Sequence, residues 1–280
     1  MEPVRAADGA TSQVRLYRSA DNPSAPVLVC MPAMGTRAAY YAPFAEALFQ
    51  AGFQVAVGEL RGQGTSSVRA QRGARYGYHE MVAYDFPALF RTVAGAFPSA
   101  PHYLLGHSLG GQLGMLYLSQ EPHMAKGAIL VGAPSCHYGG WPFPKSLGML
   151  VGIHLAVGIA SVLGYFPGRR IGALGNNSTQ TMCDMAAQVR TGRYQVPSSD
   201  VDFEPLLPRV DLPVLAVAIE GDNLAPRRGI QAFCKKLTSA QVTHWELVLD
   251  GSARRLRHYG WVHANASLVD RVRTFVSSHR

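Results

Sequence analysis

The sequence predicts an α/β fold in which helices cover both faces of a mostly parallel, doubly wound sheet. Short apolar runs rich in β-branched residues alternate with segments of helical spacing along most of the chain. Hydrophobic residues make up 48% of the 280 residues and charged residues 16%, a composition that fills a large core and excludes a disordered chain. We find no internal repeat of about 20 to 50 residues, which excludes a solenoid.

Each predicted strand is an apolar run, and each predicted helix repeats apolar residues every three or four positions. Gly52 is a stop signal after the first helix, and Pro87 predicts a kink in the second. An antiparallel edge strand is expected at 13–18, and the other strands at 27–30, 53–57, 102–106, 129–131, 214–219 and 242–249. The helices are expected at 38–51, 79–96, 108–120, 227–237 and 261–278.

The strand–helix rhythm breaks between about residues 136 and 207. This segment holds a long apolar stretch, a Gly- and Asn-rich turn at 172–177 and a mixed helix at 179–190. We therefore expect a core domain made of 1–135 and 208–280, with a mobile helical cap at 136–207. Because the insertion follows a strand, it emerges at the carboxyl edge of the sheet, where ligands bind in open α/β folds.

The apolar stretch at 146–166 also has about the length and hydrophobicity of a membrane span. Gly148 and Gly152 even have the small-xxx-small spacing of membrane helices. His154 lies in its middle, however, and the stretch contains four glycines and has no second such stretch beside it. We expect a helix that covers an apolar pocket and touches a lipid surface peripherally, without spanning it.

The segment Gly106-His107-Ser108-Leu109-Gly110 is a G-x-S-x-G motif between an apolar strand and a helix. This context is that of a nucleophile elbow, in which a serine is exposed on a sharp strand-to-helix turn and the glycines relieve crowding. The alternative is an ordinary serine on a glycine-rich turn. We expect Ser108 to be the nucleophile and His107 to point away from it as a packing residue.

A serine nucleophile requires a base, and the base requires an orienting acid. In this architecture the acid follows a late strand, which selects Asp222, with Glu220 as the alternative. The base follows the last strand, which selects His258 in the loop before the last helix, with His263 as its rival.

The oxyanion that develops on the substrate requires preorganised N–H donors. One is expected from Leu109, directly after the nucleophile. The other is expected from the loop after the strand at 27–30, where Ala33 is the first choice and Met34 the reserve. Pro32 has no N–H to donate.

Together these residues resemble the α/β-hydrolase fold, in its serine aminopeptidase and monoglyceride-lipase-like group. The matching segments are 32–35, 61–66, the elbow at 106–110, Asp222 with Ala225-Pro226, and 258–260. The resemblance implies a triad of Ser108, Asp222 and His258, with Ala33 and Leu109 as oxyanion donors. Two positions depart from the family pattern: Met31-Pro32 replaces the usual His-Gly, and Gln63 replaces the usual His of the Arg-Gly-His-Gly turn.

The expected reaction is hydrolysis of an ester or thioester through an acyl-enzyme. The insertion is rich in Leu, Val, Ile and Met, which favours an apolar acyl group over a peptide or sugar. Residues expected to line the acyl site are Met34, Trp141, Phe143, Met149, Ile153, Val157, Tyr165 and Phe166. A cap face formed by Met149, Leu150, Ile153, Val157 and Leu163 is expected to shape it.

The net charge is +8, and 22 of the 26 basic residues are arginines. Their scatter argues against a nucleic-acid partner. Arg169, Arg170, Arg254 and Arg255 keep open an acyltransferase or thioesterase that acts on CoA-bound or carrier-protein-bound chains. A non-enzymatic binding module on the same scaffold is the third reading.

Cofactor signals are missing from the sequence. It has neither a P-loop nor G-x-G-x-x-G after the first strand, and its four widely spaced cysteines form no CxxC pair. We expect no cofactor and no metal, reduced structural thiols and a cytoplasmic location.

Overall fold

Eight strands form one mixed sheet in the order β1-β2-β4-β3-β5-β6-β9-β10. The computed structural model describes residues 1–249 and 251–279. Strand β2 runs antiparallel to both of its neighbours, β1 and β4, and all other neighbouring strands in the sheet are parallel. The strands are β1 Glu2–Arg5, β2 Thr11–Tyr17, β3 Val27–Met31, β4 Gln54–Val57, β5 His102–His107, β6 Ala128–Val131, β9 Pro213–Ile219 and β10 Gln241–Leu247.

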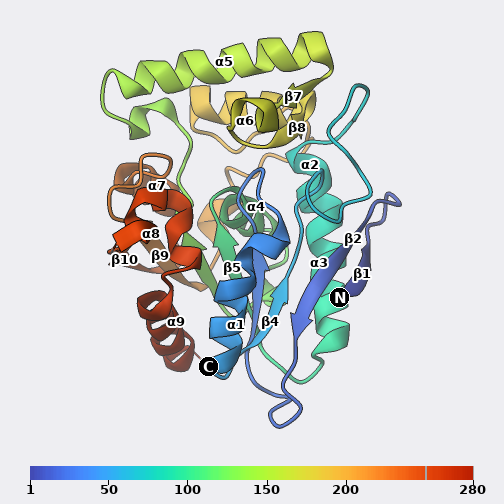
Figure 1. The fold of residues 1–280 in the computed structure, drawn as a ribbon, viewed down its shortest axis with the longest axis vertical. Coiled ribbons are helices and arrows are strands. Elements are labelled where there is room, and N and C mark those ends of the chain that lie inside the picture. The colour runs from blue at the N-terminus through green and yellow to red at the C-terminus, as the bar shows by residue number, and fades with distance from the viewer. Residues whose placement is uncertain (250, 280) are drawn as a thin grey trace.

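Helices cover both faces of this sheet, as the doubly wound pattern predicts (Figure 1). Side chains of β3 alternate between the two faces: Val27 and Val29 belong to one buried cluster, and Leu28 and Cys30 to the other. Helices α3 Phe86–Ala96 and α4 Leu109–Leu118 pack on the first face, and α1 Ala42–Gln50 and α9 Ala266–Ser278 on the second. Helix α7 Arg227–Cys234 adds Phe233 to the first cluster. The prediction of a mostly parallel α/β sheet is confirmed.

Three predicted elements differ in detail from the structure. The strand expected at the edge is β2, but it lies second in the sheet because β1 adds outside it. The helix expected at 79–96 is α2 Tyr78–Glu80 followed by α3, with a π-helical turn at Met81–Asp85 directly before the turn that contains Pro87. The last helix starts at Ala266, because residues 257–262 form a tighter 3₁₀ turn.

Between β6 and β9 the chain leaves the sheet and forms the roof seen at the top of Figure 1. Helix α5 Lys145–Leu163 lies across α6 Thr179–Thr191, and β7 Tyr165–Pro167 pairs with β8 Asn176–Ser178 in a two-stranded ribbon that the sequence did not predict. Among the described helices, α5 alone is long and apolar enough to cross a membrane by length and composition. Here it packs on the protein through Ile153, Ala156 and Ala160, which are buried.

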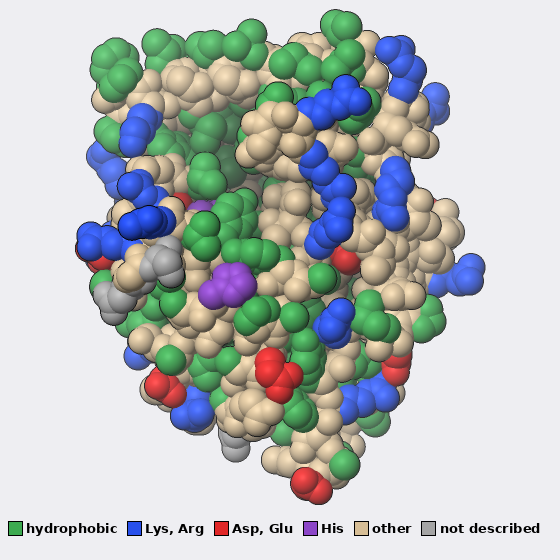
Figure 2. Space-filling view, viewed as in Figure 1, with side chains coloured by type: hydrophobic (Ala, Val, Ile, Leu, Met, Phe, Trp, Pro, Cys, Tyr) green, Lys and Arg blue, Asp and Glu red, His purple; other side chains and the backbone are tan. Residues whose placement is uncertain are grey.

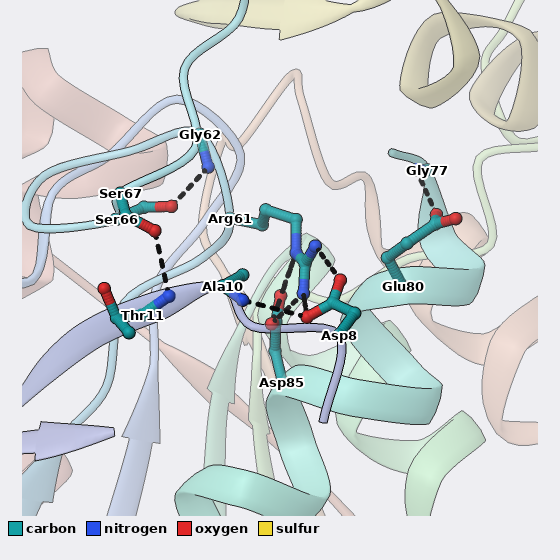
Figure 3. Close-up of polar contacts among 10 residues, drawn as sticks. All are labelled: Asp8, Ala10, Thr11, Arg61, Gly62, Ser66, Ser67, Gly77, Glu80 and Asp85. Atoms are coloured by element: carbon teal, nitrogen blue, oxygen red, sulfur yellow. Dashed lines mark hydrogen bonds and ion pairs between the residues drawn. The ribbon is translucent and has the colours of Figure 1, made fainter. Parts of the chain in front are cut away.

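A buried arginine fastens the antiparallel strands to the helical layer (Figure 3). The Arg61 side chain is 4% exposed and donates to Asp85, before α3, and to Asp8, in the turn between β1 and β2. Burial opposes its charge, but the hydrogen bonds to Asp85 and Asp8 outweigh that effect and raise the pKa of the guanidinium. Two residues after Arg61, the Gln63 side chain donates to the backbone oxygen of Asn176, at 2.8 Å, so the residue that departs from the family pattern joins core and roof.

Candidate active site

Ser108 stands on a strained turn between β5 and α4. Its φ of +51° and ψ of −118° lie where residues with side chains are rarely found, a conformation that costs on the order of 1–3 kcal/mol. The flanking glycines have no space for a side chain: a Cβ at Gly106 would lie 2.2 Å from the Gly111 Cα, and one at Gly110 would lie 2.5 Å from the Met31 oxygen. The turn therefore has the features of a nucleophile elbow, with the serine at its tip.

The acid and the base chosen from the sequence lie in contact. The Asp222 Oδ2 is 2.6 Å from the His258 Nδ1, and their side chains are 0% and 5% exposed. The other oxygen of Asp222 accepts the backbone N–H groups of Leu224 and Ala225, at 2.8 and 3.1 Å. These bonds orient the carboxylate, and the carboxylate in turn fixes the imidazole with its proton on Nδ1 and its Nε2 available as a base.

Neither rival residue joins this pair. Glu220 is exposed directly after β9, and its backbone N–H bonds to Leu247. His263 is exposed, and its ring meets Tyr40 edge-on at 5.4 Å. His258 itself lies in the 3₁₀ turn Arg257–Val262, where the sequence had placed a loop.

Ser108 and His258 both line a cavity of about 520 Å³ between the sheet and the roof. Figure 2 shows the hollow beneath α5, with hydrophobic side chains around it. Of the residues expected to line the acyl site, Met34, Met149, Ile153 and Phe166 do so. Further walls come from Leu174 and Leu224, which the sequence did not single out because they lie in irregular segments.

The other expected lining residues lie elsewhere. Trp141 is buried away from the cavity, and its indole N–H donates to the Asn223 oxygen, at 2.8 Å, which steadies the loop of the acid. Tyr165 precedes Phe166 in β7, and since neighbouring strand residues point to opposite sides, only Phe166 faces the cavity. Val157 is half-buried and packs against the core cluster, outside the cavity lining, and Phe143 is 81% exposed.

Of the two predicted oxyanion donors, Leu109 lies in the cavity lining, whereas the Ala33 N–H is engaged elsewhere. The Ala33 N–H donates to the Tyr41 hydroxyl at 2.9 Å, so it is not free for a substrate oxygen. Met34, the reserve choice, lines the cavity together with Leu109. Within the described residues, neither the Met34 N–H nor the Leu109 N–H has a protein acceptor. The geometry therefore favours these two groups as the donors.

His107 is buried between the His258 ring and the Tyr41 hydroxyl. Its ring packs against the His258 ring at a tilt of 40°, with centroids 4.5 Å apart, and its Nδ1 lies 2.7 Å from the Tyr41 hydroxyl. Burial, and next the neighbouring His258, lower the pKa of His107 well below its ordinary value. The Tyr41 hydroxyl thus accepts the Ala33 N–H and makes a second hydrogen bond with the His107 Nδ1. This network, which sequence reasoning treated as packing, ties the oxyanion loop to the base.

Two further polar residues of the cavity bear on its chemistry. Gln112 lies one helical turn after Ser108 and accepts hydrogen bonds from Gln188 of α6 and from Tyr194, which hold the roof to the core. Its spacing of four residues from the serine was a signal available in the sequence. Burial raises the pKa of Cys136 to about 11, so at neutral pH this thiol is no rival nucleophile.

Comparisons with known proteins identify the family of this chain. The family of serine aminopeptidases S33 matches residues 22–246. Human lysosomal acid lipase/cholesteryl ester hydrolase is 34% identical over 85 residues, which are 28% of this chain and about a fifth (21%) of that protein.

Solved structures share the fold. The esterase EaEST from Exiguobacterium antarcticum has a TM-score of 0.65 at 16% identity, over 99% of both chains. Est1E from Butyrivibrio proteoclasticus has a TM-score of 0.68 at 14% identity, over 100% of this chain and 99% of that one. At these identities the likeness concerns the fold alone. The family match covers most of the chain, and the chain therefore belongs to the serine aminopeptidase S33 family and is a hydrolase of the α/β-hydrolase fold.

Proposed function

We propose that this hydrolase cleaves esters or thioesters of an apolar acyl group through Ser108, His258 and Asp222. The observation that carries the proposal is the cavity of about 520 Å³, because the serine and the histidine open directly onto apolar walls. Its size is in the usual range for small-molecule sites. The walls suit a hydrocarbon chain, and the buried Asp222–His258 pair supplies the base.

In the proposed reaction the Ser108 Oγ attacks the acyl carbon while its proton passes to the His258 Nε2. Asp222 stabilises the imidazolium that forms, and the Leu109 and Met34 N–H groups bind the oxyanion. The bond to the leaving group then breaks, and His258 returns the proton to the departing alkoxide or thiolate. Water, deprotonated by the same histidine, attacks the acyl-serine, releases the acid and restores the hydroxyl.

The family description names aminopeptidases, and the cavity argues against that substrate here. An aminopeptidase must hold the free ammonium group of a peptide, for which a carboxylate is the natural partner. Among the described residues that line the cavity none is Asp or Glu, and the residues of the roof that face it are almost all apolar or glycine. We therefore place the acyl side of an ester or thioester in this cavity.

A fluorophosphonate tests the nucleophile, since it phosphonylates only an activated serine. Intact-mass analysis should show one adduct on the wild type and none on Ser108→Ala, with Ser135→Ala as the matched control that keeps the adduct. Ester hydrolysis is then measured on p-nitrophenyl esters of graded chain length. Labelling that persists in folded Ser108→Ala, or a preference for acetyl over longer esters, contradicts the proposal.

A second candidate, a thioesterase or acyltransferase for CoA-bound or carrier-bound chains, is favoured by one observation. Beside the acyl cavity lies a smaller pocket of about 140 Å³, whose described lining residues include Arg37, Arg69 and Arg169 and no carboxylate. Three guanidinium groups are suited to a phosphate. The segment 169–176 forms a wall of both pockets, with residues 171–174 toward the acyl cavity.

Replacing two of these arginines distinguishes the thioesterase or acyltransferase from the simple esterase. Arg37→Gln/Arg69→Gln should lower kcat/KM for an acyl-CoA by about tenfold or more, because each charged hydrogen bond contributes ~1.5–3 kcal/mol. The rate on a p-nitrophenyl ester of the same chain should stay unchanged. Equal effects on both substrates, or none, would remove phosphate recognition from the proposal and leave the simple esterase.

A further inference from the structure

The outer face of α5 carries a row of large apolar side chains that the described residues leave uncovered. Leu147, Val151, Leu155 and Ile159 recur every four residues, which places them on one side of the helix. We call the full row the α5 ridge. Its members and exposed fractions are Phe143 81%, Leu147 52%, Val151 49%, Leu155 63%, Ile159 44%, Val162 74% and Leu163 41%. Contiguous exposed apolar side chains on this scale mark an interaction surface.

Positive charge surrounds the α5 ridge, and negative charge is missing from its neighbourhood in the chain. Residues 122–183 contain no Asp or Glu. Lys145 stands exposed at one end of α5, and at the other end Arg72 donates to the Val162 oxygen. Arg170 is exposed shortly after the helix, and Arg190 borders a shallow groove beside Val151. Figure 2 shows the hydrophobic edge along the top and basic side chains below it.

We propose that the α5 ridge docks on the surface of an anionic lipid bilayer, with α5 lying in the plane of the interface. A helix with an exposed apolar face and a basic border has the character of an interfacial anchor, which gains both from burial of its apolar side and from attraction to anionic headgroups. The helix does not span the bilayer, because Ile153, Ala156 and Ala160 are buried against the protein beneath it.

The charges also decide against a second copy of this chain as the occupant. Two ridges packed face to face would bring the basic border of one copy toward the basic border of the other, with no carboxylate from 122–183 to offset the repulsion. An anionic bilayer supplies the missing negative charge. The ridge is continuous with the acyl cavity, since Leu155 and Ile159 belong to both. If the proposed function holds, an acyl substrate meets the cavity where it leaves the lipid.

Vesicle flotation of the purified full chain tests the proposal without any substrate. Binding is measured on vesicles of phosphatidylcholine alone and of an equal mixture with phosphatidylglycerol. The wild type should float with the anionic vesicles and lose that binding in high salt. A triple variant replaces three ridge residues that do not line the acyl cavity, Leu147→Ser/Val151→Ser/Val162→Ser. It should lower the partition coefficient for the vesicles by about tenfold or more. Val248→Ser, at a site 60% exposed after β10, is the matched control and should bind like the wild type.

A second variant addresses the charges. Lys145→Gln/Arg170→Gln should keep its weak binding to phosphatidylcholine and lose most of its preference for the anionic vesicles, since each basic residue near the surface contributes ~1 kcal/mol, or about fivefold. Thermal unfolding by circular dichroism checks that every variant folds. If the triple variant fails to fold, Val162→Ser alone replaces it, with an expected loss of about threefold.

Four results would overturn the inference. The first is a wild type that floats with neither kind of vesicle, and the second is a folded triple variant that binds vesicles as well as the wild type does. The third is binding that resists extraction with alkaline carbonate, as a membrane-spanning helix would. The fourth is a wild-type dimer in solution that the triple substitution dissociates, while neither protein binds vesicles. Because no step requires catalysis, these results are independent of fluorophosphonate labelling at Ser108, so failure of the docking surface and failure of the proposed function remain distinguishable.

Discussion

The floor of the acyl cavity and helix α5 of its roof are built in opposite ways. On the floor, Ser108, Asp222 and His107 each have defined backbone or side-chain partners, and a Cβ at Gly106 would collide with backbone. In the roof, only three residues of α5 are buried. A Cβ added at its glycines 148, 152 or 158 would meet nothing within 4 Å.

This contrast shows in which part of the molecule the side chains must be positioned accurately. The reacting groups must be held to a fraction of an ångström, so the floor is over-determined by close packing and hydrogen bonds. The roof needs only to be apolar and of the right depth. Substitutions in the floor should therefore cost rate or stability, and substitutions in the roof should alter which substrates fit.

The largest effect on activity is expected at His258, the proposed general base in the floor. His258→Ala should lower kcat/KM on the order of 10⁴-fold, about as much as Ser108→Ala, because triad members act as a unit. His263→Ala, five residues on and exposed, is the control and should keep wild-type kinetics. Comparable activity of His258→Ala and the wild type would show that the base lies elsewhere.

A pair of glycine substitutions tests the contrast directly. Gly110→Ala places a methyl group 2.5 Å from the Met31 and Pro32 oxygens and should lower the free energy of unfolding by about 1–3 kcal/mol, together with activity. Gly152→Ala meets open space in the middle of α5 and should raise it by about 0.5–1 kcal/mol. Urea denaturation measures both. Changes of equal sign would end the distinction between floor and roof.

Removal of one buried hydroxyl probes the network under the floor. Tyr41→Phe leaves the Ala33 N–H and the His107 Nδ1 without their partner in a buried site, which should lower the free energy of unfolding by about 1–3 kcal/mol. Activity should fall as well, since the oxyanion loop loses its anchor. Tyr40→Phe removes only a longer, half-buried bond to the Tyr259 oxygen, at 3.2 Å, and is the control with the smaller loss.

The smallest change in total activity is expected in the roof. Ile153→Trp fills part of the cavity, so p-nitrophenyl esters of long chains should lose about tenfold while the acetyl ester is largely unaffected. Val157→Trp lies outside the lining and should leave the chain-length profile unchanged. A uniform loss over all esters in Ile153→Trp would make this position a support of the fold.

Most of the floor could be predicted because its motifs are local or ordered along the chain. The elbow is one turn, and Asp222 and His258 each follow a strand in an order that the architecture imposes. The sequence analysis preferred Ala33 to Met34, and the geometry favours Met34, because the Tyr41 hydroxyl, from the turn before α1, accepts the Ala33 N–H.

The roof was predictable in kind but not in detail. The break in rhythm and the apolar run indicated an inserted helix over the sheet, and α5 lies there (Figure 1). Which of its residues face the cavity depends on the rotation of the helix on α6 and on the pleat of β7, and hydrophobicity could not reveal either, because α5 is apolar all round. Trp141, Tyr165 and Val157 were chosen by residue type and failed for that reason.

The segment 169–176 lines two pockets: Arg169 and Asn176 line the arginine pocket, and residues 171–174 line the acyl cavity. The segment also packs tightly on the loop after β3, since a Cβ on Gly175 would lie 2.4 Å from the Gly35 Cα, and one on Gly35 would lie 2.4 Å from the Leu174 oxygen. A displacement of this segment would therefore change the walls of both pockets. Linkage then requires reciprocity: if a phosphate among the arginines tightens the hold on an acyl chain by some factor, the acyl chain tightens the hold on phosphate by that same factor.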